Sequence, residues 1–187
     1  MSRTMKSLIF ALGLGAAATG WASGPILVTE PGGDGFNIET MVFNGSSFDL
    51  MRLSFDFTHT LTSDGGHLVI DGSPLSLTPL SGGSATFFGS GSVFGFDFSG
   101  FNTFDTFKFK WDPDSNLSGA YGASGLDFVG ARVTAVTSAG VYAGNFGRVG
   151  DTADVSAVLS PVPEPAAYLM ALTGVLLLAG HRRSGRR

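Results

Sequence analysis

Apolar and polar residues alternate along the middle of this chain with a period of two, the spacing typical of β-strands that bury one face. The clearest run is residues 49–62, in which one parity is largely apolar and the other polar. The apolar parity holds Met51, Leu53, Phe55, Phe57 and Leu61, and the polar parity holds Arg52, Ser54, Asp56, Thr58, Thr60 and Thr62. We therefore expect a half-buried strand here, then a hairpin turn at 63–66 and a returning strand at 67–71.

Further strand-like runs continue to the end of this middle region. They cover residues 38–43, 85–88, 94–98, 107–111, 126–137, 141–146 and 154–159. Gly130 lies inside the longest of them and predicts a bulge or bend. Turn-forming Gly, Ser and Asp separate the runs, and helical periodicity is absent between the two ends of the chain. About eight to ten short strands of this kind predict an all-β domain, an antiparallel β-sandwich or jelly roll.

The N-terminus has the pattern of a secretory signal peptide, which would form a helix before removal. Arg3 and Lys6 give a positive start, and an apolar run extends from Leu8 to Ala18. Small residues before and at Ala22 predict cleavage by signal peptidase between Ala22 and Ser23. The alternative is an uncleaved anchor helix. We expect residues 1–22 to be a signal peptide and the protein to be exported.

The C-terminus, residues 161–187, contains three different segments. Val162, Pro163, Glu164 and Pro165 form a short motif in which each proline favours an extended conformation of the residue before it. Residues 166–180 are 15 positions without a charge, fewer than the roughly 20 that span a hydrocarbon core without adjustment. A basic tail follows, with Arg182, Arg183, Arg186 and Arg187. We expect a single transmembrane helix at about 166–180 with the arginines on the cytoplasmic side; the alternative is a buried helix of a globular domain.

This order of Pro-Glu-Pro, short hydrophobic helix and arginine-rich end resembles the PEP-CTERM sorting signal of Gram-negative bacteria, a segment also labelled an ice-binding protein C-terminal domain. The resemblance implies that an exosortase recognises Pro163-Glu164-Pro165 and removes the tail. It also implies that the protein is anchored briefly in the inner membrane and then reaches the cell surface or an extracellular exopolysaccharide matrix. The second label is no indication of ice binding by this chain.

The segment between the two processing signals, residues 23–160, has the length of one domain. The chain has no cysteine, so the domain must fold without disulfides. Between Ser23 and Pro165 there are 15 acidic residues and five basic ones, which gives a net charge of 5 − 15 = −10. A charge of this sign repels phosphate backbones, so we expect no nucleic-acid partner.

The sequence contains no recognisable catalytic motif. The serine-containing turns lack the spacing of a nucleophile elbow. His59 and His67 lie on either side of the expected hairpin and cannot both reach one zinc ion in either register of that hairpin. A pair of carboxylates remains open, because 15 acids make some close pair inevitable. We expect a protein that is not an enzyme.

One acidic segment could bind calcium. Asp112, Asp114 and Asn116 place oxygen-bearing side chains at relative positions 1, 3 and 5, as at the start of a calcium loop. Leu117 occupies the position that requires glycine in such loops, and Ala123 the position of the final glutamate. The alternative is an ordinary turn after the strand at 107–111. No other cofactor is expected.

Three functions are compatible with these sequence features. The leading one is a structural or adhesive role in the envelope or the exopolysaccharide. A carbohydrate-binding module is an alternative, and it would require Trp111, Tyr121 and Tyr142 to cluster on one exposed face. A glycan-active enzyme is the third, and it would require a cleft with converging carboxylates.

Overall fold

The computed structural model describes residues 25–30, 35–118 and 121–163. The expected signal peptide, its cleavage site between Ala22 and Ser23, the expected transmembrane helix and the arginine tail lie outside the described residues. Within the described ranges, none of the helical segments has the length and apolar character needed to cross a bilayer.

The described chain is built from β-strands and one short 3-10 helix, η1 (Gly125–Phe128). The strands are β1 (Ile26–Glu30), β2 (Ile38–Asn44), β3 (Leu50–Asp56), β4 (Leu68–Ile70), β5 (Ser76–Leu77), β6 (Ser84–Ser90), β7 (Val93–Phe101), β8 (Thr106–Trp111), β9 (Pro113–Ser115), β10 (Arg132–Thr137), β11 (Gly140–Asn145), β12 (Gly147–Arg148) and β13 (Val155–Pro161). The expectation of an all-β fold is confirmed.

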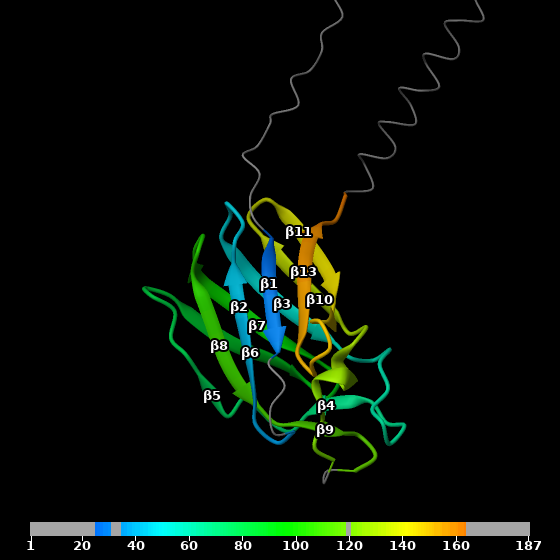
Figure 1. The fold of residues 1–187 in the computed structure, drawn as a ribbon. Coiled ribbons are helices and arrows are strands. Elements are labelled where there is room, and N and C mark those ends of the chain that lie inside the picture. The colour runs from blue at the N-terminus through cyan, green and yellow to red at the C-terminus, as the bar shows by residue number, and fades with distance from the viewer. Residues whose placement is uncertain (1–24, 31–34, 119–120, 164–187) are drawn as a thin grey trace, which may run out of the picture.

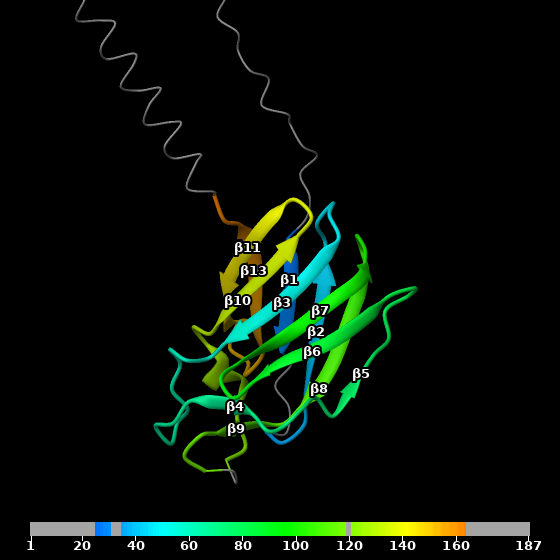
Figure 2. The same cartoon turned by 180° about the vertical axis from the view of Figure 1, so that it is seen from behind.

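Eleven of these strands form one curled antiparallel sheet in the order β5-β8-β2-β1-β13-β11-β10-β3-β7-β6, with β12 paired to β13. The half with β8, β2, β1 and β13 faces the half with β10, β3, β7 and β6, as Figures 1 and 2 show from opposite sides. The two halves are joined because β13 pairs with β1 along its length and with β11 near its end. The domain is therefore a half-barrel made of one continuous sheet, where the sequence predicted two separate sheets or a jelly roll.

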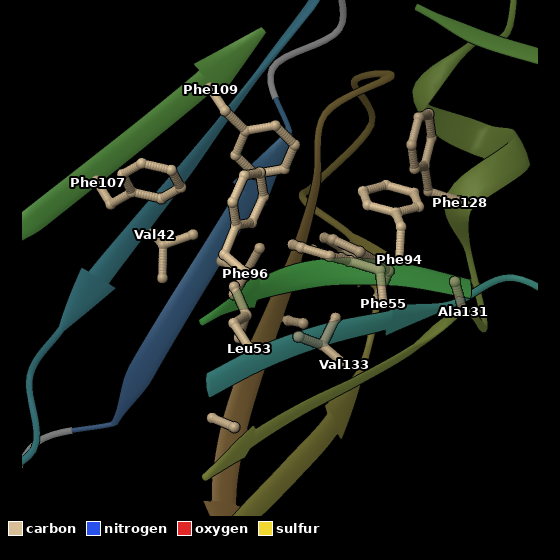
Figure 3. Close-up of a cluster of buried hydrophobic side chains, with 14 of the residues drawn as sticks. Val42, Leu53, Phe55, Phe94, Phe96, Phe107, Phe109, Phe128, Ala131 and Val133 are labelled. Atoms are coloured by element: carbon tan, nitrogen blue, oxygen red, sulfur yellow. The ribbon is translucent and has the colours of Figure 1, made fainter. Parts of the chain in front are cut away.

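Phenylalanine fills the space between the two halves. Phe107 and Phe109 point inward from β8, and Phe94 and Phe96 point inward from β7 (Figure 3). The Phe96 and Phe109 ring centroids are 4.7 Å apart, so side chains of the two halves are in direct contact across the core. Burying one such ring contributes about 1.5–3 kcal/mol, which explains how a chain without disulfides holds this fold.

The strand predicted at residues 49–62 is shorter in the structure. The alternation of buried and exposed side chains along it shifts by one residue near its start. A register shift between Leu50 and Arg52 buries Leu50 and leaves Met51 exposed, because a bulge adds one residue and reverses the alternation. The strand ends at Asp56, whose carboxylate accepts hydrogen bonds from the backbone N–H and the hydroxyl of Thr58 at 2.9 and 2.6 Å. Leu61 is consequently exposed and lies outside the sheet.

The predicted turn at 63–66 forms, since the N–H of Thr62 donates to Gly66 O at 2.9 Å, but the segments on its two sides do not pair as the strands of a hairpin. The returning segment is β4, which pairs with β9 in a separate two-stranded sheet. Its partner begins at Pro113, where the sequence indicated a turn or a calcium loop. The segment expected to bulge at Gly130 divides there: η1 precedes it, Gly130 adopts a positive φ of 92°, and β10 begins after it.

Both described chain ends lie at one end of the half-barrel. Ile26, at the start of β1, pairs with Leu159 near the end of β13 and with Asn44 at the end of β2. The β2–β3 turn (45–49) and the β7–β8 turn (102–105) lie at this end too, since Asn44 bonds to both Phe104 and Asp105. We call this end the terminal pole; β4 and β9 lie at the opposite end, the distal pole (Figure 1).

Candidate functional site

The Pro-Glu-Pro motif, which the sequence predicts to act in sorting, begins where the sheet ends. Pro161 is the last residue of β13 and pairs with Tyr142. One residue later, the backbone N–H of Val162 donates to Val141 O at 2.8 Å. Val162 and Pro163 are exposed at the terminal pole, and Glu164 and Pro165 lie outside the described residues. The sheet therefore holds the chain up to the residue directly before Pro163-Glu164-Pro165.

Two exposed phenylalanines lie at the same pole as this exit point, on the β2–β3 and β7–β8 turns. Phe104 is 73% exposed and Phe48 is 38% exposed. The Phe104 ring stacks on Phe43 of β2, with centroids 6.3 Å apart and an angle of 26° between the planes. We call Phe43, Phe48 and Phe104 the aromatic tip. The sequence does not predict it, because none of these residues is distinguished from the core phenylalanines by its spacing.

The buried Asn44 holds the two turns of the tip together. Its side-chain amide donates to Phe48 O at 2.9 Å and to Asn102 O at 3.1 Å. Its backbone carbonyl accepts from the N–H of Phe104 at 2.7 Å. Each of these bonds fixes backbone rather than a mobile side chain, so the two phenylalanines are presented on a rigid frame.

Phe104 also has a strained backbone. Its φ is 67°, the one positive φ of a residue other than glycine among the described residues. A bulky side chain in this region costs on the order of 1–3 kcal/mol and is retained only where its surroundings enforce it. Here Asp105 closes the turn, with its carboxylate accepting from Asn102 N at 2.9 Å. This turn therefore holds Phe104 at a positive φ, with its ring largely exposed against Phe43.

A second unusual group, Glu30, lies inside the half-barrel. It ends the inward-facing row of β1 and is almost completely buried. Burial raises the pKa of Glu30 to about 8, and hydrogen bonds from Thr40 and Trp111 counteract only part of this effect. Its Oε2 atom has no hydrogen-bond partner in the structure. Glu30 points inward, whereas Glu39 on the neighbouring strand β2 points outward and pairs with Lys108, so these two carboxyl groups do not face one another.

The calcium candidates lie at the distal pole along strand β9. Asp112, Asp114 and Asn116 share one parity of an extended segment, in which positions 1 and 5 are about 13 Å apart. The Asn116 amide oxygen already accepts from the backbone N–H of His67 at 2.8 Å. In the part of the chain that the structure describes, no three His, Asp or Glu side chains are grouped so that they could hold a metal ion. Calcium binding therefore stays a prediction that requires rearrangement of this segment.

Asp114 is nevertheless an unusual carboxylate. It is 8% exposed, and its Oδ1 atom has no hydrogen-bond partner. Burial raises its pKa, and the nearby carboxylates of Asp112 and Asp71 raise it further. Asp71 lies across the β4–β9 ribbon, where its backbone N–H donates to Asp112 O at 3.2 Å. Like charge is thus concentrated on one face of this ribbon.

His67 and the tryptophan and tyrosines of the domain have structural roles. His67 Nδ1 is 2.7 Å from Thr60 O, which fixes the loop after β3. Trp111 and Tyr142 are buried, and the Tyr121 hydroxyl donates to Asp127 Oδ2 at 3.0 Å. The exposed cluster of Trp111, Tyr121 and Tyr142 that a sugar-binding platform would require is therefore not formed.

One open pocket of about 350 Å³ lies on the outer face of β1, β2 and β8. Met41 contributes an apolar wall, and Lys108 forms an ion pair with Glu39 at 2.9 Å. The lining residues include three acidic residues, Glu30, Glu39 and Asp154, and no histidine or serine. Glu30 is also among the lining residues because it lies at the end of β1, but its side chain points toward the core of the half-barrel.

The most informative site is therefore the terminal pole, which carries both the chain exit and the aromatic tip. Comparison with known proteins adds no constraint, since no protein-family profile, no curated protein and no solved structure matches this chain.

Proposed function

We propose that this chain is an exported β-domain that is anchored in the inner membrane by residues 166–180 and released by an exosortase to the cell surface or matrix of a Gram-negative bacterium. Its role there is structural or adhesive. The observation that carries the proposal is the position of Val162: the sheet binds this residue through Val141, and the Pro-Glu-Pro motif follows at once.

The length of the connection supports this interpretation. Three residues, Pro163 to Pro165, separate Val162 from the apolar run that begins at Ala166. An extended chain can cover at most about 14 Å between the Cα atoms of Val162 and Ala166. The headgroup layer on each side of a bilayer is about 5–8 Å thick. The motif would therefore be held at the membrane surface, where a membrane-embedded protease can reach it.

The position of the N-terminus is consistent with the same topology. Pro25, the first described residue, is exposed and precedes β1 at the terminal pole. Cleavage after Ala22 would leave a short segment at that pole and would not cut into the sheet. Both processing events would then occur beside the membrane and leave the half-barrel unchanged.

The proposal is tested in the native host by changing Glu164 to Ala. Glu164 is the one ionised side chain of the motif and the natural partner for a charge-assisted contact with the protease. We expect the variant to be exported and folded, to start at Ser23, and to accumulate as an uncleaved form in the inner membrane. Deletion of residues 166–187 should instead release the domain without sorting.

Mass spectrometry of both termini, with and without the exosortase, measures these outcomes. Glu39→Ala is the matched control, because Glu39 is a partly exposed glutamate within the sheet. A Glu164→Ala protein that matured at the wild-type rate would contradict recognition through this motif. A wild-type protein that still began at Met1 after export would contradict the signal peptide.

A further inference from the structure

We propose that the aromatic tip rests on the surface of the bilayer that anchors the chain, with Phe104 and Phe48 inserted among zwitterionic lipid headgroups. This inference rests on the proposed function, because it requires residues 166–180 to be in the membrane. It adds a second contact between the domain and the bilayer, and so fixes the orientation of the half-barrel.

The first argument is the position of the tip relative to the chain exit. Ile26 on β1 lies between Asn44, which holds the tip, and Leu159 on β13, which leads to the exit. Adjacent strands are about 4.8 Å apart, so the tip and the exit are separated by only a few strand spacings. Figures 1 and 2 both show the β2–β3 turn and the end of β13 at the same end of the molecule.

The second argument is the shortness of the tether. The three residues after Val162 span at most about 14 Å to Ala166, and the headgroup layer takes up about half of that distance. A domain on such a short connection cannot be held far from the bilayer. The side chains that project from the terminal pole must therefore lie at or near headgroup level.

The third argument is the chemistry of the two turns. An aromatic ring at the boundary between headgroups and acyl chains is a recurring form of membrane contact. The turns 45–49 and 102–105 contain no lysine or arginine, and each contains an aspartate, Asp49 and Asp105. These charges disfavour an anionic lipid surface, so the tip is suited to zwitterionic lipid and to insertion of rings rather than to binding of phosphate.

The strained, rigid presentation of Phe104 fits this role. Its ring is fixed by the stack on Phe43 and by the backbone bond to Asn44, so little conformational entropy is lost on insertion.

The test places a tryptophan at the tip of the full-length chain. The protein carries Trp21→Phe, so that the buried Trp111 is the constant background. Phe104→Trp is compared with Leu117→Trp, which lies at the distal pole and is 67% exposed. Both proteins are reconstituted into phosphatidylcholine vesicles that contain lipid brominated near the headgroup end of the acyl chain, a short-range quencher of tryptophan.

We expect both proteins to float with the vesicles, and Phe104→Trp fluorescence to be quenched at least about twofold more than that of Leu117→Trp. Phe48→Trp, on the other turn, should be quenched to a similar extent as Phe104→Trp. This second position keeps the test valid if the substitution at position 104 disturbs its own turn. Near-ultraviolet circular dichroism of Trp111 reports whether each variant is folded.

The outcomes separate the two proposals. Equal quenching of the tip and distal variants in floated protein would overturn the tip contact and leave the membrane anchor standing. Failure of both proteins to float would overturn the anchor and with it the tip contact. A blue shift of Phe104→Trp that depended on protein concentration and not on lipid would assign the tip to a second copy of the chain, against this proposal.

Discussion

The Thr40 hydroxyl donates a hydrogen bond to Glu30 Oε1 in the core, and the same oxygen of Thr40 accepts from Trp111 Nε1–H at 2.9 Å. The three side chains come from β1, β2 and β8, so one polar chain crosses three adjacent strands. Burial raises the pKa of Glu30 to about 8. At neutral pH the carboxyl is therefore mainly protonated, and the core contains a neutral network rather than a buried charge.

This network makes stability depend on pH, and Glu30→Gln should remove the dependence. In the unfolded chain Glu30 ionises near 4.5, and in the folded chain near 8. Between these values unfolding releases a proton, so the free energy of unfolding falls as pH rises, by up to about 1.4 kcal/mol per pH unit. Above about 8 the decline levels off. We expect the Tm of the wild type to fall from pH 5 to pH 8 and that of Glu30→Gln to fall much less.

Glu39→Gln is the control for this comparison. Glu39 is on the outward-facing side of β2 and pairs with Lys108 at the surface. Its substitution leaves the Thr40–Glu30 hydrogen bond in place, so a change of slope seen only in Glu30→Gln is assigned to Glu30. A Glu30→Gln protein whose Tm followed the wild-type slope would show that Glu30 is ionised in the folded state.

Asp114→Asn should stabilise the protein at neutral pH. Burial and the carboxylates of Asp112 and Asp71 raise the pKa of Asp114, so its ionised form is disfavoured in the folded state. A neutral amide costs less to bury than a carboxylate beside two others. Thermal unfolding without divalent cations should give a higher Tm for Asp114→Asn at pH 7. The difference should shrink toward pH 3.8, the ordinary pKa of aspartate.

Calcium provides a second use of the same variant. An ion held by Asp112, Asp114 and Asn116 would offset the repulsion and raise the Tm of the wild type at millimolar calcium. Asp114→Asn would abolish that increase. An unchanged wild-type Tm would leave the segment as strand β9 and its following turn.

The sequence predicted the class of the fold because alternation survives wherever strands face the core. Leu53, Phe55 and Phe57 were assigned inward, and all three are buried. It failed where one residue changes the period: the bulge at Met51 exposes a side chain that the pattern buried. The sequence also failed to predict strand pairing, because the alternation along a strand does not specify which strand it pairs with. Strand β4 pairs with β9 rather than with β3.

The candidate site was predictable only in part. The Pro-Glu-Pro prediction comes from local sequence alone, since it depends only on residues next to each other. Phe104 could not, because its exposure follows from a turn and from hydrogen bonds to Asn44, which is 60 positions away in the chain. A phenylalanine in a turn has the same letter as one in the core, and only the folded backbone distinguishes them.

Gly95→Ala tests the close approach of β3 and β7. A Cβ atom at Gly95 would lie 2.0 Å from Leu53 O and 2.9 Å from Ser54 Cα, both backbone atoms. The strands would have to separate, which should cost several kcal/mol, on the order of 3 or more. Gly147→Ala is the matched control, since nothing lies within 4 Å of its added Cβ. Urea unfolding measures both, and equal midpoints would contradict the close contact.

Phe104→Asn tests whether the tip is retained at a cost to stability. Asparagine tolerates a positive φ better than phenylalanine, so the variant loses strain as well as the stack on Phe43. We expect a free energy of unfolding within about 1 kcal/mol of the wild type, in either direction. Phe107→Ala, which removes a fully buried ring, should by contrast lose about 3–5 kcal/mol. A loss of that size in Phe104→Asn would assign Phe104 to the core rather than to an external contact.

Lengthening the tether should separate anchoring from orientation. In the wild type the sheet holds Val162 through Val141, and the motif follows without a linker. An insertion of eight Gly and Ser residues between Val162 and Pro163 adds a flexible segment with a root-mean-square length of about 16 Å. This exceeds the headgroup layer of about 5–8 Å, so the domain can leave the surface while residues 166–180 remain in the bilayer. We expect the inserted protein to float with vesicles as before and to be processed in the host, because the motif and apolar run are unchanged.

Quenching of tryptophan at position 104 by brominated lipid should fall toward the value at position 117. If quenching stayed at its original level, the tip would bind the membrane by its own affinity, and the short tether would not be what places it there.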